Sequence, residues 1–87
     1  MDFTMEIGTH NKEGEYIVLI SEKSIIPSIP PTGTEIIYRN NILQLSKVYF
    51  DLETQSVYGD VDQYFEGEFS QQDIENKFLK NGWKIKH

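Results

Sequence analysis

The chain has 87 residues, no cysteine and a formal net charge of −6, which suits one domain with a modest core and excludes disulfides and thiolate metal sites. Hydrophobic residues make up 38% of the sequence, which argues against disorder, and the acidic balance argues against direct binding of duplex DNA. No apolar run reaches membrane-spanning length and the first residues lack a signal-peptide pattern, so we expect a soluble, cytoplasmic protein without a membrane partner.

The N-terminal part of the chain predicts an opening β-hairpin. Phe3, Met5 and Ile7 alternate with polar residues, which is the period-2 pattern of a half-buried strand. Residues 16–20 are rich in β-branched side chains and predict a second, more buried strand. The proline-rich segment 27–33 that follows predicts an extended connector, because proline cannot donate to a strand ladder.

Residues 35–39 and 42–52 predict the third and fourth strands. A tight turn at Asn40 and Asn41 would join them, because asparagine tolerates positive φ angles. The alternation of the fourth strand slips near Ser46, where the apolar residues change parity from Leu43 and Leu45 to Val48, Phe50 and Leu52. A slip of one residue moves side chains to the other face, so the pattern indicates a β-bulge at this position.

Residues 56–66 show the clearest strand pattern in the sequence. The odd positions, with Val57, Val61 and Phe65, predict a face turned to the core, and the even positions carry acidic residues and tyrosines.

A short helix over about residues 71–81 follows this strand. Ser70 is suited to cap its first turn, and Asp73 completes a variant of the capping box. Gly82 stands where a left-handed residue ends a helix, and Trp83 after it fits a Schellman motif with Phe78. Residues 83–86 then alternate as a short closing strand.

The predicted fold is therefore a single α+β domain over residues 1–87 that consists mainly of antiparallel β structure. Two arrangements stay open, a small SH3-like barrel or a bent sheet of five to six strands, with the short helix before the last strand.

Acidity is concentrated in the second half of the chain. Residues 48–76 hold eight acidic residues and no lysine or arginine, so the rest of the chain carries a net charge of +2. A region of one charge sign attracts partners of the opposite sign. The acidic residues of this region are Asp51, Glu53, Asp60, Asp62, Glu66, Glu68, Asp73 and Glu75.

The even face of residues 56–66 and the residues just after it form the candidate partner-binding site. Tyrosines beside carboxylates can receive lysine or arginine side chains, although ordinary cross-strand aromatic pairing is the simpler explanation of the tyrosines. The predicted site residues are Tyr58, Asp60, Asp62, Tyr64, Glu66 and Glu68.

Metal and catalytic sites receive less support from the sequence. The pairs Asp60/Asp62 and Glu66/Glu68 offer oxygen ligands, but the loop pattern of a calcium hand is absent and a solvated sheet face explains them. His10 in a polar loop and His87 at the end of the sequence complete no recognisable catalytic motif. We therefore assign no catalytic, metal or cofactor residues.

Residues 30–37 and 42–51 resemble short uncharacterised proteins of bacterial phages and mobile elements. The shared pattern is a proline, a glycine shortly after it, a strand, a tight turn and a Val-x-x-Val-x-x-Asp strand, in which Leu45, Val48 and Asp51 stand here. The resemblance implies no activity, and it assigns no functional residues.

The sequence thus predicts a non-enzymatic interaction module whose acidic, tyrosine-bearing sheet face binds a basic protein or peptide. A sharper version is a phage-type mimic that presents its carboxylates as a row of phosphates to a nucleic-acid-binding cleft. The alternative is a small structural subunit that forms homo-oligomers through exposed sheet edges.

Overall fold

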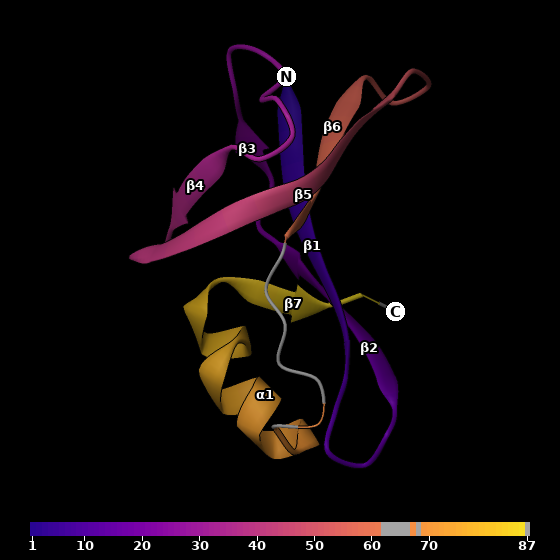
Figure 1. The fold of residues 1–87 in the computed structure, drawn as a ribbon, viewed down its shortest axis with the longest axis vertical. Coiled ribbons are helices and arrows are strands. Elements are labelled where there is room, and N and C mark those ends of the chain that lie inside the picture. The colour runs from indigo at the N-terminus through magenta and orange to yellow at the C-terminus, as the bar shows by residue number, and fades with distance from the viewer. Residues whose placement is uncertain (62–66, 68, 87) are drawn as a thin grey trace.

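One curled β-sheet forms most of the molecule, and a short helix lies against it near the C-terminus of the chain (Figure 1). The computed structural model describes residues 1–61, 67 and 69–86. Within these residues there are seven strands, one more than the largest number predicted, because the two-residue strand β3 is too short to leave a sequence pattern. The elements are β1 (Asp2–His10), β2 (Tyr16–Ser21), β3 (Ser24–Ile25), β4 (Glu35–Tyr38), β5 (Asn41–Asp51), β6 (Ser56–Val61), α1 (Gln71–Lys77), η1 (Leu79–Asn81) and β7 (Trp83–Ile85).

The strands are arranged in the order β4-β5-β6-β1-β2-β7, and β3 pairs with β1 beside this path. The predicted hairpin of β1 and β2 is confirmed, and β4, β5 and β6 also pair antiparallel in sequence order. In contrast, β1 and β6 run parallel, with Met5 opposite Gly59. The expectation of antiparallel pairing is therefore wrong for these two strands. They are not joined by a tight turn, which would force opposite directions, because β2 to β5 lie between them in the sequence.

The apolar core lies on the inner face of the curled sheet. Phe3, Met5 and Ile7 are buried, while the residues between them on β1 are only half-buried, which confirms the predicted alternation. Burial of these side chains supplies the main driving force for folding. The full set of buried core residues is Phe3, Met5, Ile7, Leu19, Leu43, Leu45, Val57, Val61, Ile74 and Trp83.

The inner face of β6 follows the prediction as far as the structure describes it. Val57 and Val61 are buried, and Gly59 between them leaves room for the aromatic ring of Phe3. A Cβ atom at Gly59 would lie 3.3 Å from this ring, so only glycine fits without moving a core side chain. The predicted continuation of the strand over residues 62–66, including the inward position of Phe65, lies outside the described residues.

The predicted β-bulge is confirmed at Ser46. The pairing of β5 with β6 shifts there, from Leu45 opposite Val61 to Lys47 opposite Asp60. The Ser46 hydroxyl donates a hydrogen bond to the Asp60 carbonyl at 3.2 Å. The extra residue lets Val48 pack against the core despite its change of parity from Leu43 and Leu45, whereas Phe50 and Leu52 remain 37% and 81% exposed.

The turn between β4 and β5 lies one residue earlier than predicted. Tyr38 pairs with Asn41, so the two turn residues are Arg39 and Asn40, with φ angles of 49° and 66°. Two successive positive φ angles are the requirement of a type I′ turn, whose twist matches that of a hairpin. The sequence pattern did not indicate Arg39, because arginine is uncommon in this conformation.

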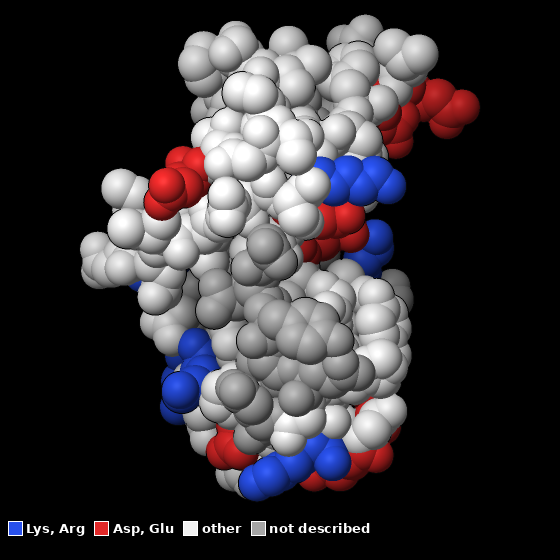
Figure 2. Space-filling view, in the orientation of Figure 1, with Lys and Arg blue, Asp and Glu red and all other residues white. Residues whose placement is uncertain are grey.

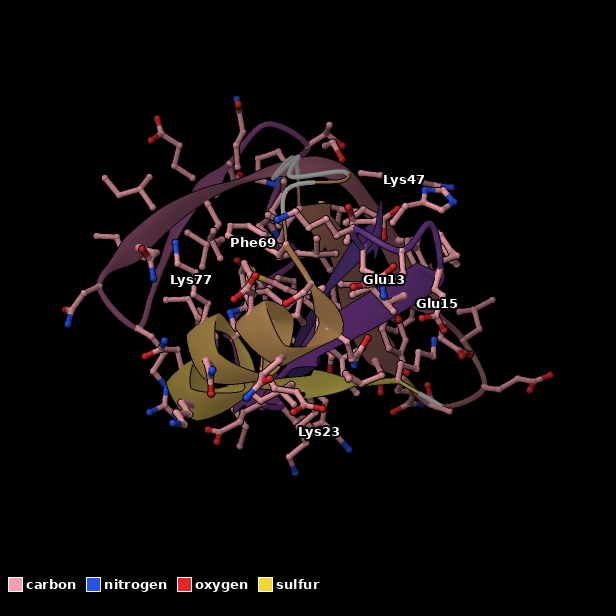
Figure 3. The ribbon with its side chains drawn as sticks, turned by 90° about the horizontal axis from the view of Figure 1, so that it is seen from below. Glu13, Glu15, Lys23, Lys47, Phe69 and Lys77 are labelled. Atoms are coloured by element: carbon pink, nitrogen blue, oxygen red, sulfur yellow. The ribbon has the colours of Figure 1, made fainter. Side chains whose placement is uncertain are left out.

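The start of the predicted helix is confirmed. The Ser70 hydroxyl accepts a hydrogen bond from the Asp73 backbone N–H, and the Asp73 carboxylate accepts one from the Ser70 N–H, each at 3.1 Å. The bond from the Ser70 N–H lowers the pKa of Asp73 because it stabilises the charged carboxylate. Figure 3 shows Phe69 and Lys77 beside α1, where the Lys77 Nζ atom lies 4.9 Å from the centre of the Phe69 ring.

The helical segment ends as the sequence predicted, although it is not one continuous α-helix. The α-helical part ends at Lys77, and residues 79–81 form a 3₁₀ turn. Gly82 has a φ angle of 85°, and the Trp83 N–H donates to the Phe78 carbonyl at 3.2 Å. This is the outer hydrogen bond of a Schellman motif, which turns the chain into β7.

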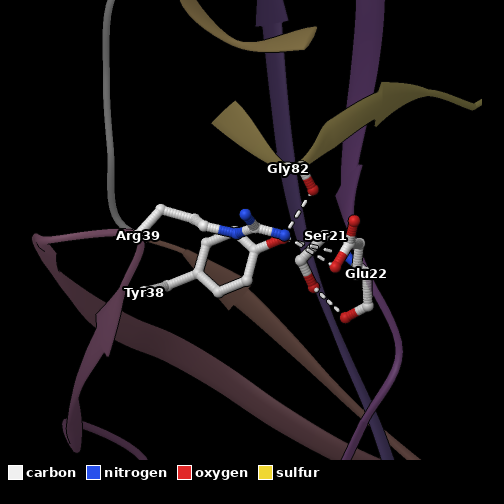
Figure 4. Close-up of polar contacts among 5 residues, drawn as sticks. All are labelled: Ser21, Glu22, Tyr38, Arg39 and Gly82. Carbon is white, nitrogen blue, oxygen red and sulfur yellow. Dashed lines mark hydrogen bonds and ion pairs between the residues drawn. The ribbon is translucent and has the colours of Figure 1, made fainter. Parts of the chain in front are cut away.

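The two edges of the sheet meet at Tyr38, and this contact closes the sheet into a half-barrel (Figure 4). The Tyr38 hydroxyl donates to the Gly82 carbonyl at 2.5 Å and accepts from the Glu22 N–H at 3.1 Å. The Tyr38 ring also meets Trp83 edge-on, with 5.4 Å between the ring centres. Arg39 adds an ion pair with Glu22 at 2.8 Å. Because the sheet is a half-barrel and not a complete barrel, the bent-sheet alternative describes the observed architecture.

Candidate partner-binding groove

Two of the six predicted site residues lie in the described part of the chain, and both are on the outer face of the sheet. Tyr58 and Asp60 are half-buried there, while Val57, Gly59 and Val61 face the core. The predicted division of this strand into two faces is therefore confirmed for residues 57–61. The other predicted site residues lie outside the described residues, and they are Asp62, Tyr64, Glu66 and Glu68.

Parallel pairing places a second carboxylate next to Asp60. Glu6 on β1 is the direct cross-strand partner of Asp60 on β6, so both side chains lie on the outer face. The Glu6 side chain is only 16% exposed, which deprives its charge of most of its hydration. Two like charges at directly paired positions repel each other, so this arrangement requires nearby cations. This pair could not be predicted from the sequence, because 53 residues separate its members.

Two tyrosines line the outer face beside the carboxylates. Tyr49 on β5 pairs with Tyr58 on β6, and their rings stack with 5.5 Å between the centres and 20° between the planes. This is the cross-strand aromatic pair that the sequence left as the simpler explanation for Tyr58. Partial burial raises the pKa of Tyr49, and the charges of Glu6 and Asp60 raise it further, because all three disfavour the phenolate.

Two lysines, one on β5 and one just beyond β7, bring positive charge to the carboxylates. Lys47 lies opposite Asp60 on β5, with its Nζ atom 5.6 Å from the centre of the Tyr49 ring. Lys86, just after β7, places its Nζ atom 3.0 Å from a carboxylate oxygen of Glu6. The hydrogen bond and the charge of Glu6 raise the pKa of Lys86. The described part of this face thus carries two adjacent carboxylates with a lysine on either side, rather than the uniformly acidic surface that the sequence suggested.

The face of the molecule drawn in Figure 2 shows the same mixing of charges among the described residues. In Figure 2 the acidic residues form separate patches, and lysine or arginine lies beside several of them. The difference from the linear pattern arises because strand pairing puts Lys47 opposite Asp60 and because Lys86 reaches Glu6.

An open groove of about 640 Å³ runs over this part of the outer face. Tyr16 forms one wall and is 64% exposed, and its ring lies over Gly8 and 5.3 Å from the ring of His10. The sequence suggested that His10 lies in a polar loop. In the structure it is instead the last residue of β1. The groove is lined by Glu6, Gly8, Tyr16, Val18, Lys47, Tyr49, Asp60 and Val61.

The groove can hold charged side chains by ion pairing and by contact with aromatic faces. Carboxylates bind ammonium and guanidinium groups, and tyrosine rings attract cations through their faces. Among the residues that the structure describes, no three histidine, aspartate or glutamate side chains converge as ligands of a metal ion would. Of the alternative metal ligands Asp60, Asp62, Glu66 and Glu68, only Asp60 is among these residues.

Comparison of the chain with known protein families, with curated proteins and with solved structures finds no match. In the described part of the chain, no helix has the length and apolarity required to cross a membrane.

Proposed function

We propose that the protein is a non-enzymatic interaction module that binds a basic segment of a partner protein in the outer-face groove. The observation that carries this proposal is the pairing of Glu6 with Asp60 beside the stacked rings of Tyr49 and Tyr58. The carboxylates supply charge, and the rings supply apolar surface that a lysine or arginine stem can cover. The predicted residues Asp62, Tyr64, Glu66 and Glu68 would extend this binding surface.

The chain itself supports cationic ligands at this place. Lys47 approaches the Tyr49 ring, and Lys86 contacts Glu6 at 3.0 Å, so a lysine ammonium group has the geometry that both positions require. A partner segment would present its own cations to the same groups. Because the groove is open, an extended chain could enter it without unfolding the sheet.

Titration with pentalysine as a model basic peptide tests the proposal. The double variant Glu6→Gln/Asp60→Asn removes the two groove carboxylates, and we expect it to weaken binding at least about tenfold. The control Glu53→Gln/Glu75→Gln removes the same charge from two exposed residues that do not line the groove, and it should weaken binding no more than about threefold. Equal losses in both variants would contradict a groove-specific site and indicate only a general field effect.

Two finer parts of the prediction remain proposals. Mimicry of a nucleic acid, the use fitting the phage resemblance, would depend mainly on the carboxylates outside the described residues, since lysines interrupt the row at Asp60. An SH3-like identity is supported by the curl of the sheet and by the helical turn before the last strand. The parallel pairing of β1 with β6 argues for a more distant relationship.

A second candidate function is homo-oligomerisation through the sheet edge at β4. The observation that favours it is the cross-strand pair Ile37 and Ile42, whose residues are 77% and 66% exposed on the hairpin that forms this edge. An exposed apolar edge strand readily pairs with another strand. Sedimentation over a range of protein concentrations would detect such an oligomer, and Ile37→Lys should abolish it. A monomer at all concentrations would exclude this function.

A further inference from the structure

We propose that Lys86 is an internal substitute for the partner's cation, which occupies Glu6 in the free protein and leaves it when a basic segment binds. This inference rests on the proposed function and specifies how the groove is regulated. It follows from the unequal environments of the two charges that form the contact.

The Glu6 carboxylate needs a cation more than Lys86 needs an anion. The Glu6 side chain is 16% exposed and lies beside the like charge of Asp60, whereas the Lys86 side chain is 55% exposed. A largely dehydrated carboxylate without a partner is unfavourable, but a released lysine ammonium group at the surface is readily rehydrated. Exchange of Lys86 for a partner's cation therefore leaves both charges satisfied.

The path of the chain allows this exchange without a change of fold. Lys86 lies just beyond β7, and its backbone N–H donates to the Val18 carbonyl on β2 at 2.8 Å. Its side chain crosses β2 to reach Glu6 on the next strand. Rotation of the flexible lysine stem is enough to open the Glu6 position, while the backbone hydrogen bond stays in place.

Lys47 occupies a corresponding position on the opposite side of the groove. It approaches the Tyr49 ring from β5, whereas Lys86 approaches Glu6 from β7. The groove therefore has two cation positions, and each is filled by a lysine of the chain. This arrangement favours a ligand with two basic side chains over one with a single charge, because such a ligand can replace both lysines.

Pentalysine titrations of the wild-type protein, Lys86→Gln and Lys84→Gln test the role of Lys86. Lys86→Gln should bind about two- to fivefold more tightly than Lys84→Gln, because it frees the Glu6 carboxylate from a partly exposed ion pair. Lys84→Gln is the matched control, since it removes the same charge two residues earlier, from an exposed residue of β7 that forms no ion pair within the described part of the chain. Side-chain NMR signals of Lys86 in the wild-type protein should also shift on binding.

Each outcome decides between the alternatives. Equal affinities of the two variants would overturn the inference and leave only a net-charge effect. Weaker binding by Lys86→Gln would also overturn it, because Lys86 would then support the site. If the wild-type protein binds but the inference fails in either of these ways, the proposed function survives. Absence of binding by all three proteins would overturn the proposed function, and the inference with it.

Discussion

Removal of the Tyr38 hydroxyl is expected to open the contact that joins the two edges of the sheet. In Tyr38→Phe the ring stays against Trp83, but the hydrogen bonds to the Gly82 carbonyl and from the Glu22 N–H are lost. A hydrogen bond between neutral groups contributes about 0.5–1.5 kcal/mol. Because the Glu22 N–H is exposed and water can replace its partner, we expect a total loss of about 1–2 kcal/mol, or about 5–10 °C in Tm.

Two further variants separate the parts of this contact. Tyr38→Ala also removes the half-buried ring and should raise the loss to about 3–4 kcal/mol. Gly82→Ala should lose about 2 kcal/mol or more, because alanine is strained at a φ angle of 85° and its Cβ would lie 2.6 Å from the Tyr38 hydroxyl. In the Tyr38→Phe background this second loss should shrink by about 1 kcal/mol, because the close contact with the hydroxyl is gone.

Urea denaturation followed by the fluorescence of Trp83, the single tryptophan, measures these differences in unfolding free energy. Circular dichroism provides a second signal that does not depend on the ring contact with Tyr38. Tyr49→Phe serves as the control, because its hydroxyl makes no hydrogen bond within the described part of the chain, and its stability should stay within about 0.5 kcal/mol of wild type. A similarly small change in Tyr38→Phe would refute closure of the sheet through this hydroxyl.

Two further predictions concern the helix start and the groove. Ser70→Ala should lower the unfolding free energy by about 1 kcal/mol through loss of the cap, and an unchanged urea midpoint would exclude the observed capping box. Because the pKa of Asp73 is lower in the folded state, its stabilising effect should be present above its ordinary value of 3.8 and be lost as the pH falls, which a comparison with Asp73→Asn between pH 6 and 2 would detect. The pKa of Tyr49 is raised, so its phenol should ionise above pH 10.0. The difference in ultraviolet absorbance between wild type and Tyr49→Phe measures this ionisation. The contribution of the neutral phenol to stability should be lost as the pH rises further. Titration of Tyr49 at or below pH 10.0 would contradict its placement beside Glu6 and Asp60.

Local features of the fold could be predicted because a few neighbouring residues determine them. The bulge at Ser46 follows from a change of parity within one strand, and the helix start at Ser70 follows from a four-residue capping pattern. Gly82 could be predicted in the same way, since a left-handed residue favours glycine. Arg39 in the turn could not, because its ion pair with Glu22, which lies just after β2, depends on the fold.

The pairing of distant strands could not be predicted, and the candidate groove depends on that pairing. Tyr58 and Asp60 were found because they share one face of a clearly patterned strand. Glu6, Lys47 and Lys86 were missed, because parallel pairing of β1 with β6 and the position of β7 bring them there. The only signal for Glu6 was its even position on β1, opposite in parity to the buried residues.

Charge compensation in the groove has a consequence for how a basic partner would be attracted. The row of Lys47, Asp60, Glu6 and Lys86 is neutral as a whole, so it contributes little to the long-range field of a chain whose net charge is −6. Exposed acidic residues in the β1–β2 and β5–β6 loops, Glu13, Glu15 and Glu53, lie at opposite ends of the molecule (Figure 1). Attraction over distance would then come from such loops, and selectivity from the exchange of cations in the groove. Raising the ionic strength should accordingly slow association more than it speeds dissociation, because screening acts most strongly on separated charges.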